Sequence, residues 1–281
     1  MLNSKNDLNL NNSMNSKKKF EQPSVASNTV AELSAKLIEA NKKLQDAEQE
    51  RTIMLENISH DLRAPLTAIR STIDYMKQKS ECDKLDISED EIRAMINLLD
   101  VRAKTLEVLV HEFYYLTCIE SGRDDLSLQE VPLAQFLEEY FFAAEIDDKY
   151  DGKNLNLDVP ENMDALVRID TAKMSRVLDN LFTNARKYSG DGATITLGAF
   201  EKDDSVCFYV RDTGYGIPKE SLDHIFKRTY RVSDSRTPAQ EASSGLGLTI
   251  VKSIVEQHGG TIMCESEYGE GSVFTVSIPR I

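Results

Sequence analysis

The segment "ENISHDLRAPLTAIR", residues 56–70, carries a histidine, His60, next to an acid, Asp61, in a stretch whose other residues mostly favour a helix. A neutral imidazole is abundant at pH 7 and can attack a phosphoryl group that lies in line with it. A histidine at an arbitrary position more often has a surface or core role. His60 is therefore a candidate nucleophile, and the rest of the chain has to decide between these interpretations.

Four short motifs follow in the second half of the chain, and each is a weak signal alone. They are "DNLFTNARKYS" (179–189), "DTGYGIP" (212–218), "IFKRTYRV" (225–232) and "SSGLGL" (243–248). A glycine pair is more often a turn than a nucleotide site, and two asparagines on a helix are usually surface residues or caps. Only their order and spacing, taken with the histidine segment, are informative.

Asn180 and Asn184 lie one helical turn apart and therefore share one face of a predicted helix. The amide oxygen of asparagine is a hard ligand, and Mg²⁺ prefers oxygen ligands while it keeps several waters. The spacing makes this pair a candidate Mg²⁺ site.

Asp212 ends an apolar strand, where a carboxylate can accept a hydrogen bond from an exocyclic amine. The alternative is an ordinary turn acid at a strand end. Gly214 and Gly216 would let the backbone approach a nucleotide closely. Gly245 and Gly247 open a predicted helix whose N-terminal amides suit a phosphate. These residues predict a nucleotide site built from separate parts of the chain.

The composition limits the class of protein. The 281 residues suggest two domains, and 33 Lys and Arg against 47 Asp and Glu give a formal net charge of −14. This negative charge disfavours sequence-independent binding to the phosphate backbone of nucleic acids, so nucleic acid is not an expected partner. No run approaches the roughly 18 apolar residues of a membrane span, and the first residues lack the apolar core of a signal peptide. We expect a cytoplasmic chain.

The four cysteines, Cys82, Cys118, Cys207 and Cys264, lie far apart, without the spacing of a zinc site or a disulfide framework. We expect reduced thiols that are mostly buried.

The first two segments differ in their pattern. Residues 1–28 are rich in Asn, Ser and Lys, so we predict a disordered tail, and its three consecutive lysines ordinarily form a solvated cluster rather than a membrane contact. In residues 29–52 apolar side chains recur at alternating three- and four-residue steps, which predicts a coiled-coil helix. The same register continues to Ile58, which would lie on the packed side. His60 follows two residues later, about 200° around the helix from Ile58, so its side chain would point away from the packed side.

Residues 53–122 are predicted to form a helical hairpin. Ser88 and Glu91 have the spacing of a capping box at the start of its second helix, and Gly122 is a natural stop. The apolar face of the two helices is wider than a hairpin can hide. Dimerisation into a four-helix bundle is the economical arrangement.

Residues 123–281 are predicted to form an α+β domain with one mixed sheet covered by helices. Strand patterns occur at residues 165–170, 193–200, 205–212, 260–266 and 272–278, and helical patterns at residues 132–146, 171–188 and 246–258. The four motifs lie in or beside these elements.

Taken together, the histidine helix and the four motifs resemble the transmitter core of bacterial sensor histidine kinases over about residues 50–280. The resemblance implies a dimeric domain for dimerisation and histidine phosphotransfer, followed by an ATP-binding sandwich of the gyrase, histidine kinase and MutL type. It implies ATP-dependent autophosphorylation of His60, with Mg²⁺, and transfer to an aspartate on the receiver domain of a response regulator. The chain would then be a cytosolic core or the cytosolic part of a larger or membrane-associated sensor.

The resemblance also implies roles for individual residues. Asp61 would orient the His60 ring or take its proton, Asn184 would bind the metal with Asn180 assisting, and Asp212 would read the adenine amino group. The remaining implied nucleotide contacts are Lys187, Tyr188, Gly214, Gly216, Arg231, Gly245, Leu246, Gly247 and Leu248. Residues 219–244 would form a flexible lid over ATP, and Lys187, Tyr188 and Arg231 could equally be surface residues.

Three alternative functions compete with this interpretation: ATP hydrolysis, a non-catalytic scaffold and a serine kinase. ATP-hydrolysing relatives such as gyrase and MutL carry a glutamate at the position matching Asn180, and an amide cannot take a proton from water. A non-catalytic scaffold would be expected to have lost a motif, and none is lost. Serine kinases that share the ATP-binding fold lack the histidine helix, so residues 50–122 argue against them.

Two neighbours of His60 carry separate expectations. Pro65 lacks an N–H and should bend or loosen the helix, which would let two partners approach the imidazole in turn. Ala64 stands where the family usually has Thr or Asn, whose side chain positions water for dephosphorylation of the partner. We expect weak or absent phosphatase activity.

Overall fold

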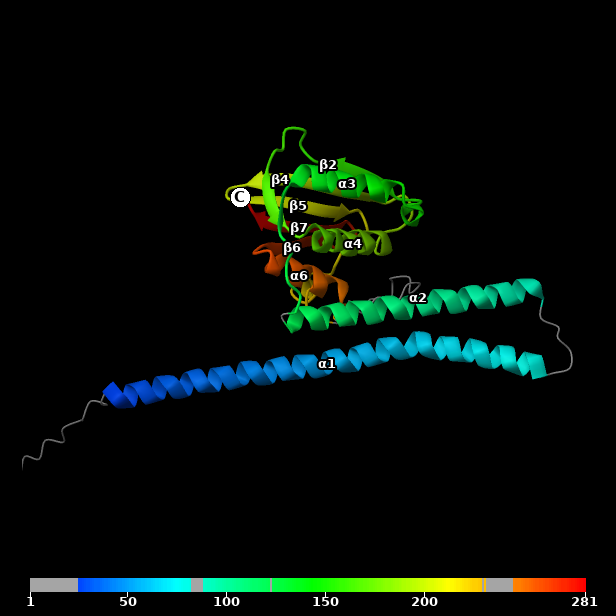
Figure 1. Ribbon diagram of the computed structural model, residues 1–281, viewed down its shortest axis with the longest axis horizontal. Coiled ribbons are helices and arrows are strands. Elements are labelled where there is room, and N and C mark those ends of the chain that lie inside the picture. Colours follow the sequence, from blue (N-terminus) through cyan, green and yellow to red (C-terminus); the bar gives the residue numbers. More distant parts are fainter. Residues whose placement is uncertain (1–24, 82–87, 122, 229, 231–244) are drawn as a thin grey trace, which may run out of the picture. The chain divides into compact units, whose positions relative to one another are not determined.

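The computed structural model describes residues 25–81, 88–121, 123–228, 230 and 245–281 (Figure 1). It contains two compact units, Met1–Arg51 and Thr52–Ile281. The predicted tail, residues 1–28, therefore lies largely outside the described residues, as do Cys82, Gly122 and most of the hairpin loop.

The first unit contains the start of helix α1, Val25–Glu81. All side chains from residue 32 to residue 49 are exposed, and these include the seam residues Leu33, Leu37 and Leu44. Ion pairs one turn apart, such as Lys36 with Glu32, line the helix surface. An exposed apolar stripe with this spacing is typical of a helix that pairs with another helix.

The second unit begins with the rest of α1 and with helix α2, Glu89–Glu120, which lies alongside it (Figure 1). The predicted capping box is confirmed, because the Ser88 hydroxyl accepts from the N–H of Glu91 and the Glu91 carboxylate accepts from the N–H of Ser88. Met54, Ile58 and Leu116 are buried along these helices. The predicted helical pair is therefore present.

The predicted mixed sheet is confirmed and has five strands. These are β2 Asn154–Asp158, β4 Thr194–Lys202, β5 Ser205–Asp212, β7 Gly271–Pro279 and β6 Thr261–Glu267, in the order β2-β4-β5-β7-β6. Strand β2 runs parallel to β4, and the other neighbours are antiparallel. The carboxyl end of β5 thereby brings Asp212 opposite Ser272 at the start of β7.

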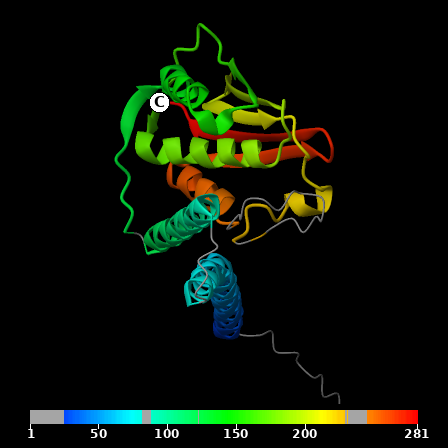
Figure 2. The ribbon, with the colours of Figure 1, turned by 90° about the vertical axis from the view of Figure 1, so that its right-hand side faces the viewer.

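Helices cover one side of this sheet (Figure 2). They are α3 Leu133–Glu145, α4 Thr171–Lys187 and α6 Gly247–Gln257, close to the predicted ranges. Alternate residues of β5, namely Val206, Phe208 and Val210, lie in the core beneath them. The core forms because a strand presents every second side chain to the same face, where the apolar sides of the helices pack.

Two further strands form a separate antiparallel pair, β1 Gln129–Pro132 and β3 Leu166–Ile169. We expected β3 in the mixed sheet, and neither β1 nor β2 was predicted. Short elements η1, Asp148–Tyr150, and α5, Lys219–Leu222, were also not predicted. These elements are too short for their periodicity to stand out from the surrounding loops.

The described cysteines Cys118, Cys207 and Cys264 carry free thiols, as predicted. Burial, and then the charge of Asp212, raise the pKa of Cys264 to about 12, so this thiol is not a reactive thiolate. Among the residues that the structure covers, no helix combines the length and apolar character needed to cross a membrane.

Candidate functional site

His60 lies on the solvent side of α1. Its side chain is 78% exposed, whereas Met54 and Ile58 are buried on the same helix, so the predicted orientation is confirmed. The ring Nδ1 lies 3.4 Å from Oδ1 of Asp61. The Asp61 carboxylate is itself largely buried, with 17% of its side chain exposed. A partly buried acid beside an exposed imidazole can hold one ring nitrogen while the other stays open to a reactant.

Helix α1 continues through Pro65, whose side chain is buried. Proline has no N–H to donate to the carbonyl four residues earlier, which weakens a helix locally. Figure 1 shows α1 changing direction in the part that belongs to the second unit, which also contains Pro65. This agrees with the expected bend. The proposed consequence, access for two partners, stays a prediction.

Asn180 and Asn184 lie half-buried on α4, one turn apart. The side-chain N–H of Asn180 donates to the carbonyl of Arg176 at 2.9 Å, which turns its Oδ1 towards the start of α6. A Cβ placed on Gly247 would lie only 2.8 Å from that Oδ1. Glycine at 247 therefore allows α6 to begin directly against the asparagine face of α4.

Asp212 is a buried carboxylate at the end of β5, with 6% of the residue exposed. Burial raises its pKa to about 6, and the N–H groups of Gly214 and Ser272 lower it only in part. The Gly214 N–H donates to Oδ1 at 2.9 Å. A carboxylate held this way, with few donors around it, suits an additional N–H donor such as an exocyclic amine.

The glycines after Asp212 allow the loop to pass close to two other elements. A Cβ on Gly214 would lie 2.3 Å from the carbonyl of Tyr188, which follows α4. Gly216 has φ +67, and a Cβ there would lie 2.1 Å from the carbonyl of Glu267. Side chains are thus excluded at both positions. The loop after β5 thus lies directly against the residue that follows α4, so the fold brings these two parts of the predicted nucleotide site together.

The remaining predicted residues divide into three groups. Lys187 and Tyr188 lie at the end of α4, with the Lys187 ammonium 5.9 Å from the centre of the Tyr188 ring. Leu246 is buried in the core and Leu248 is half-buried against it, so neither apolar side chain presents a group that binds phosphate. Arg231 and residues 231–244 of the expected lid lie outside the described residues.

Two supporting residues were missed by the sequence analysis. The Lys153 side chain is 7% exposed, and its ammonium donates to the carbonyls of Ser189 and Gly190 and so holds the turn after α4. The Ser266 hydroxyl accepts from the N–H of Ile217 and donates to the carbonyl of Gly271, which fixes the loop after Asp212. Their partners are mostly backbone groups distant in sequence, so no motif marks either residue.

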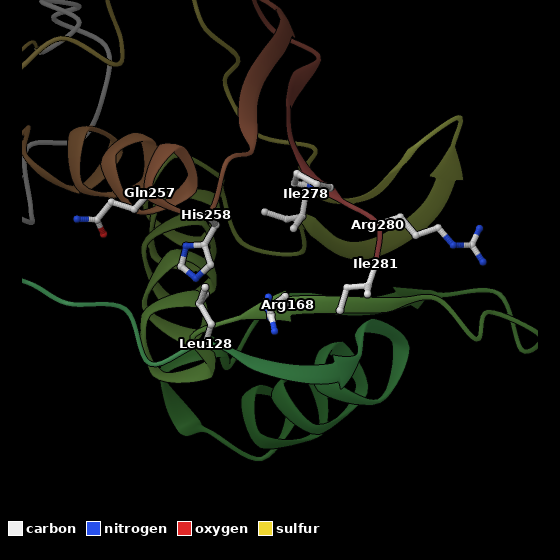
Figure 3. A pocket seen from close by; sticks show the side chains of 8 residues that line it. Leu128, Arg168, Gln257, His258, Ile278, Arg280 and Ile281 are labelled. Atoms are coloured by element: carbon white, nitrogen blue, oxygen red, sulfur yellow. The ribbon is translucent and has the colours of Figure 1, made fainter.

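A hollow of about 280 Å³ lies elsewhere on the domain and involves none of these residues (Figure 3). It is lined by Leu128, Arg168, Gln257, His258, Ile278, Pro279, Arg280 and Ile281. Arg168 is 3.7 Å from Glu130, Arg280 is paired with Glu201, and both His258 nitrogens have hydrogen-bond partners. Its charged side chains are thus already satisfied, and we do not assign it a ligand.

Two family models match the chain. The one described as the His Kinase A (phospho-acceptor) domain matches residues 50–122, which include His60. The one described as Histidine kinase-, DNA gyrase B-, and HSP90-like ATPase matches residues 169–281, which include Asn180, Asn184 and Asp212.

Among curated proteins, the chain is similar to the sensor histidine kinase WalK of Bacillus subtilis (strain 168), with 30% identity over 244 residues. It is also similar to the sensor protein SrrB of Staphylococcus aureus, with 29% identity over 233 residues. Each alignment covers 83% of this chain, but only 37% of WalK and 39% of SrrB. The chain therefore spans about two-fifths of the length of these relatives.

Two solved structures have the same fold. The histidine kinase AdeS of Acinetobacter baumannii matches 78% of this chain and 97% of its own, with a TM-score of 0.57. The histidine kinase ThkA, in complex with the response regulator protein TrrA, matches 87% of this chain and 66% of its own, with a TM-score of 0.62. Sequence identity is 23% in both cases.

Proposed function

This chain belongs to the histidine kinases of two-component systems, as a transmitter core, and we propose that it transfers the γ-phosphoryl group of ATP to its own His60. The observation that carries the proposal is the meeting of Asn180 on α4, Gly247 at the start of α6 and the Asp212 loop in an ATPase-type domain. The same chain presents an exposed histidine with an acidic neighbour on α1. These are the donor site and the acceptor of one reaction.

The surroundings of His60 favour attack by Nε2. Nδ1 lies beside Asp61, so the tautomer with a proton on Nδ1 is held there and the lone pair stays on Nε2. A bond forms between Nε2 and the γ-phosphorus, the bond from that phosphorus to the bridging oxygen breaks, and ADP leaves with the electron pair. Asp61 stabilises the positive charge that develops on the ring.

Asn184, assisted by Asn180, would hold Mg²⁺ through amide oxygens. The orientation of Asn180 supports this assignment. Its side-chain N–H donates to the Arg176 carbonyl, so its oxygen points towards the start of α6 rather than along α4. Mg²⁺ would neutralise charge on the triphosphate and orient it. Asn180 cannot remove a proton from water, which favours transfer to His60 over hydrolysis. The weak phosphatase activity expected from Ala64 stays a prediction.

The phosphoryl group would then pass to an aspartate on the receiver domain of a response regulator. The solved relative ThkA is bound to a protein of that class, and we propose the same class of partner here. A second copy of this chain is the other proposed partner, because Leu33, Leu37 and Leu44 are exposed along one seam of α1. Neither nucleic acid nor a membrane surface is proposed as a partner.

Incubation of the purified chain with γ-labelled Mg·ATP tests the proposal. We expect label on the protein that is stable in base and labile in acid, as a phosphorus–nitrogen bond is. His60→Gln should abolish it. His111→Gln is the matched control, because His111 is a second exposed histidine, on α2, and should leave the label unchanged. Label that persists in His60→Gln would overturn the assignment.

A further inference from the structure

The segment that follows α2 is bound to the ATP-binding domain by one lysine. The Lys173 ammonium, in the first turn of α4, lies 2.9 Å from Oδ1 of Asp124 and 3.1 Å from the carbonyls of both Asp124 and Asp125. The side chains of Lys173 and Asp124 are only 11% and 17% exposed. A lysine is rarely buried to this extent unless it is paired, and here it has three acceptors.

Asp170 makes a second attachment, three residues earlier. One carboxylate oxygen accepts from the N–H of Lys173 and caps α4, and the other accepts from the N–H of Ser127 at 3.0 Å. Burial would raise the pKa of Asp170, but the donors Ser127 and Lys173 outweigh it and hold this pKa below its usual value. The carboxylate is therefore ionised and able to accept both bonds at neutral pH.

The attachment is also supported by the residue that follows α6. The N–H of Asp170 donates to Nε2 of His258 at 2.9 Å, and Nδ1 of His258 donates to the carbonyl of Ile254 at 2.7 Å. His258 follows α6, and Figure 3 shows its imidazole directed away from that helix. Asp170 is thereby fixed to α6 as well as to α4, so the segment binds to a rigid base.

The backbone bonding of α2 reaches almost as far as this attachment. The N–H of Arg123 donates to the carbonyl of Cys118 at 3.1 Å, and the contacts with Lys173 begin at Asp124. The last backbone hydrogen bond to α2 and the first contact with Lys173 are therefore made by adjacent residues, Arg123 and Asp124. We name Asp124, Ser127, Asp170 and Lys173 the linker clasp.

We propose that the linker clasp shortens the hinge between the histidine-bearing helices and the ATP-binding domain, and that Lys173 is therefore a positioning residue for phosphorylation of His60. This inference rests on the proposed function. An open clasp would free residues 123–128 as a tether. If opening of the clasp makes the free tether between the two domains roughly three times longer than in the closed clasp, the effective concentration of one domain at the other falls by about fivefold. This follows from the −3/2 power of tether length.

Lys173→Met tests the inference, because Met keeps the long apolar stem but cannot bind the three oxygens. Lys173→Arg is the conservative variant, which retains the charge and the donors. Lys252→Met is the matched control, since Lys252 on α6 has an ion pair with Glu256 and is 47% exposed. Asp170 is not replaced, because it also caps α4.

Two readouts are measured on each variant of the 281-residue chain. The first is hydrogen exchange of the amides of residues 124–128, with β5 as an internal reference for intact folding. The second is the initial rate of labelling at His60, with its kcat and its KM for Mg·ATP separated. We expect Lys173→Met to exchange faster at 124–128 only, and to lose about fivefold in kcat with KM unchanged. Lys173→Arg and Lys252→Met should behave as the parent does.

Unchanged exchange in Lys173→Met would overturn the inference, because the clasp would not hold the segment. Faster exchange with unchanged kcat would overturn it as well, because hinge length would not limit the reaction. A rise in KM alone would indicate damage to the nucleotide site instead and would also contradict it. Absence of label on the parent chain would refute the proposed function, and the kinetic role of Lys173 with it, whereas exchange would still report whether the clasp exists.

Discussion

Asp212 and His60, the two residues central to the proposed reaction, differ in their exposure to solvent. Asp212 is 6% exposed and burial raises its pKa to about 6, whereas the His60 side chain is 78% exposed. A buried carboxylate with a raised pKa is costly to the unliganded protein, and such groups cluster at functional sites. An exposed imidazole remains accessible to a phosphoryl donor and then to a second protein.

The pKa of Asp212 predicts how ATP affinity depends on pH. We propose that Asp212 accepts a hydrogen bond from the adenine amino group. Only the ionised carboxylate can accept on either oxygen, so affinity should fall as the pH drops below about 6. Isothermal titration calorimetry with a non-hydrolysable ATP analogue at pH 7.5 and pH 5.5 measures this. Asp212→Asn should bind more weakly by about tenfold or more and should lose the pH dependence in this range.

The same shift gives a stability test. Because the folded-state pKa is raised, the folded protein holds more protons than the unfolded chain between pH 3.8 and about 6. The contribution of Asp212 to the free energy of unfolding therefore falls as the pH rises through that window. Without nucleotide, Asp212→Asn should remove this fall. Denaturant unfolding that shows the same pH dependence in both proteins would contradict the burial of the charge.

At the scale of elements, the long periodic segments were predictable from the sequence and the short ones were not. Strands β4, β5, β6 and β7 carry alternating or continuous apolar residues, and the capping box marked the start of α2. Strand β2 reads "NLNLD", where asparagines and only two leucines give a weak signal, and β3 pairs with β1 through a partner nearly 40 residues away. Contacts such as those of Lys153 and Lys173 go mainly to backbone carbonyls, which the sequence does not specify.

The junction of α4 and α6 predicts the effect of a single methyl group. In Gly247→Ala the new Cβ would lie 2.8 Å from Oδ1 of Asn180 and would displace that side chain. A displacement of this proposed metal ligand should reduce the labelling rate by roughly ten- to a hundredfold. Gly190→Ala is the control, because its Cβ would approach no atom closer than 3.9 Å. Equal rates in both variants would contradict the prediction that close packing of Gly247 against Asn180 matters for labelling.

At the scale of the whole molecule, the exposed seam of α1 supports the proposed dimer. Leu37 is 64% exposed, and its neighbours at seam spacing are exposed as well. Leu37→Asp places a charge in the seam of the proposed dimer and should weaken self-association by about tenfold or more in sedimentation velocity. Ile38→Asp, one residue off the seam, is the control and should associate as the parent does. Equal association of the two variants would exclude the seam as an interface.

The central claim is that ATP phosphorylates one particular histidine, and peptide mapping of the labelled protein under alkaline conditions tests it most directly. Tryptic cleavage after Arg51 and Arg63 isolates His60 in the peptide "TIMLENISHDLR", residues 52–63, apart from the other three histidines of the chain. We predict that the label from γ-labelled Mg·ATP is confined to this peptide. Label in any other peptide, or none in this one when the protein as a whole is labelled, would contradict the assignment of His60 as the phosphoryl acceptor.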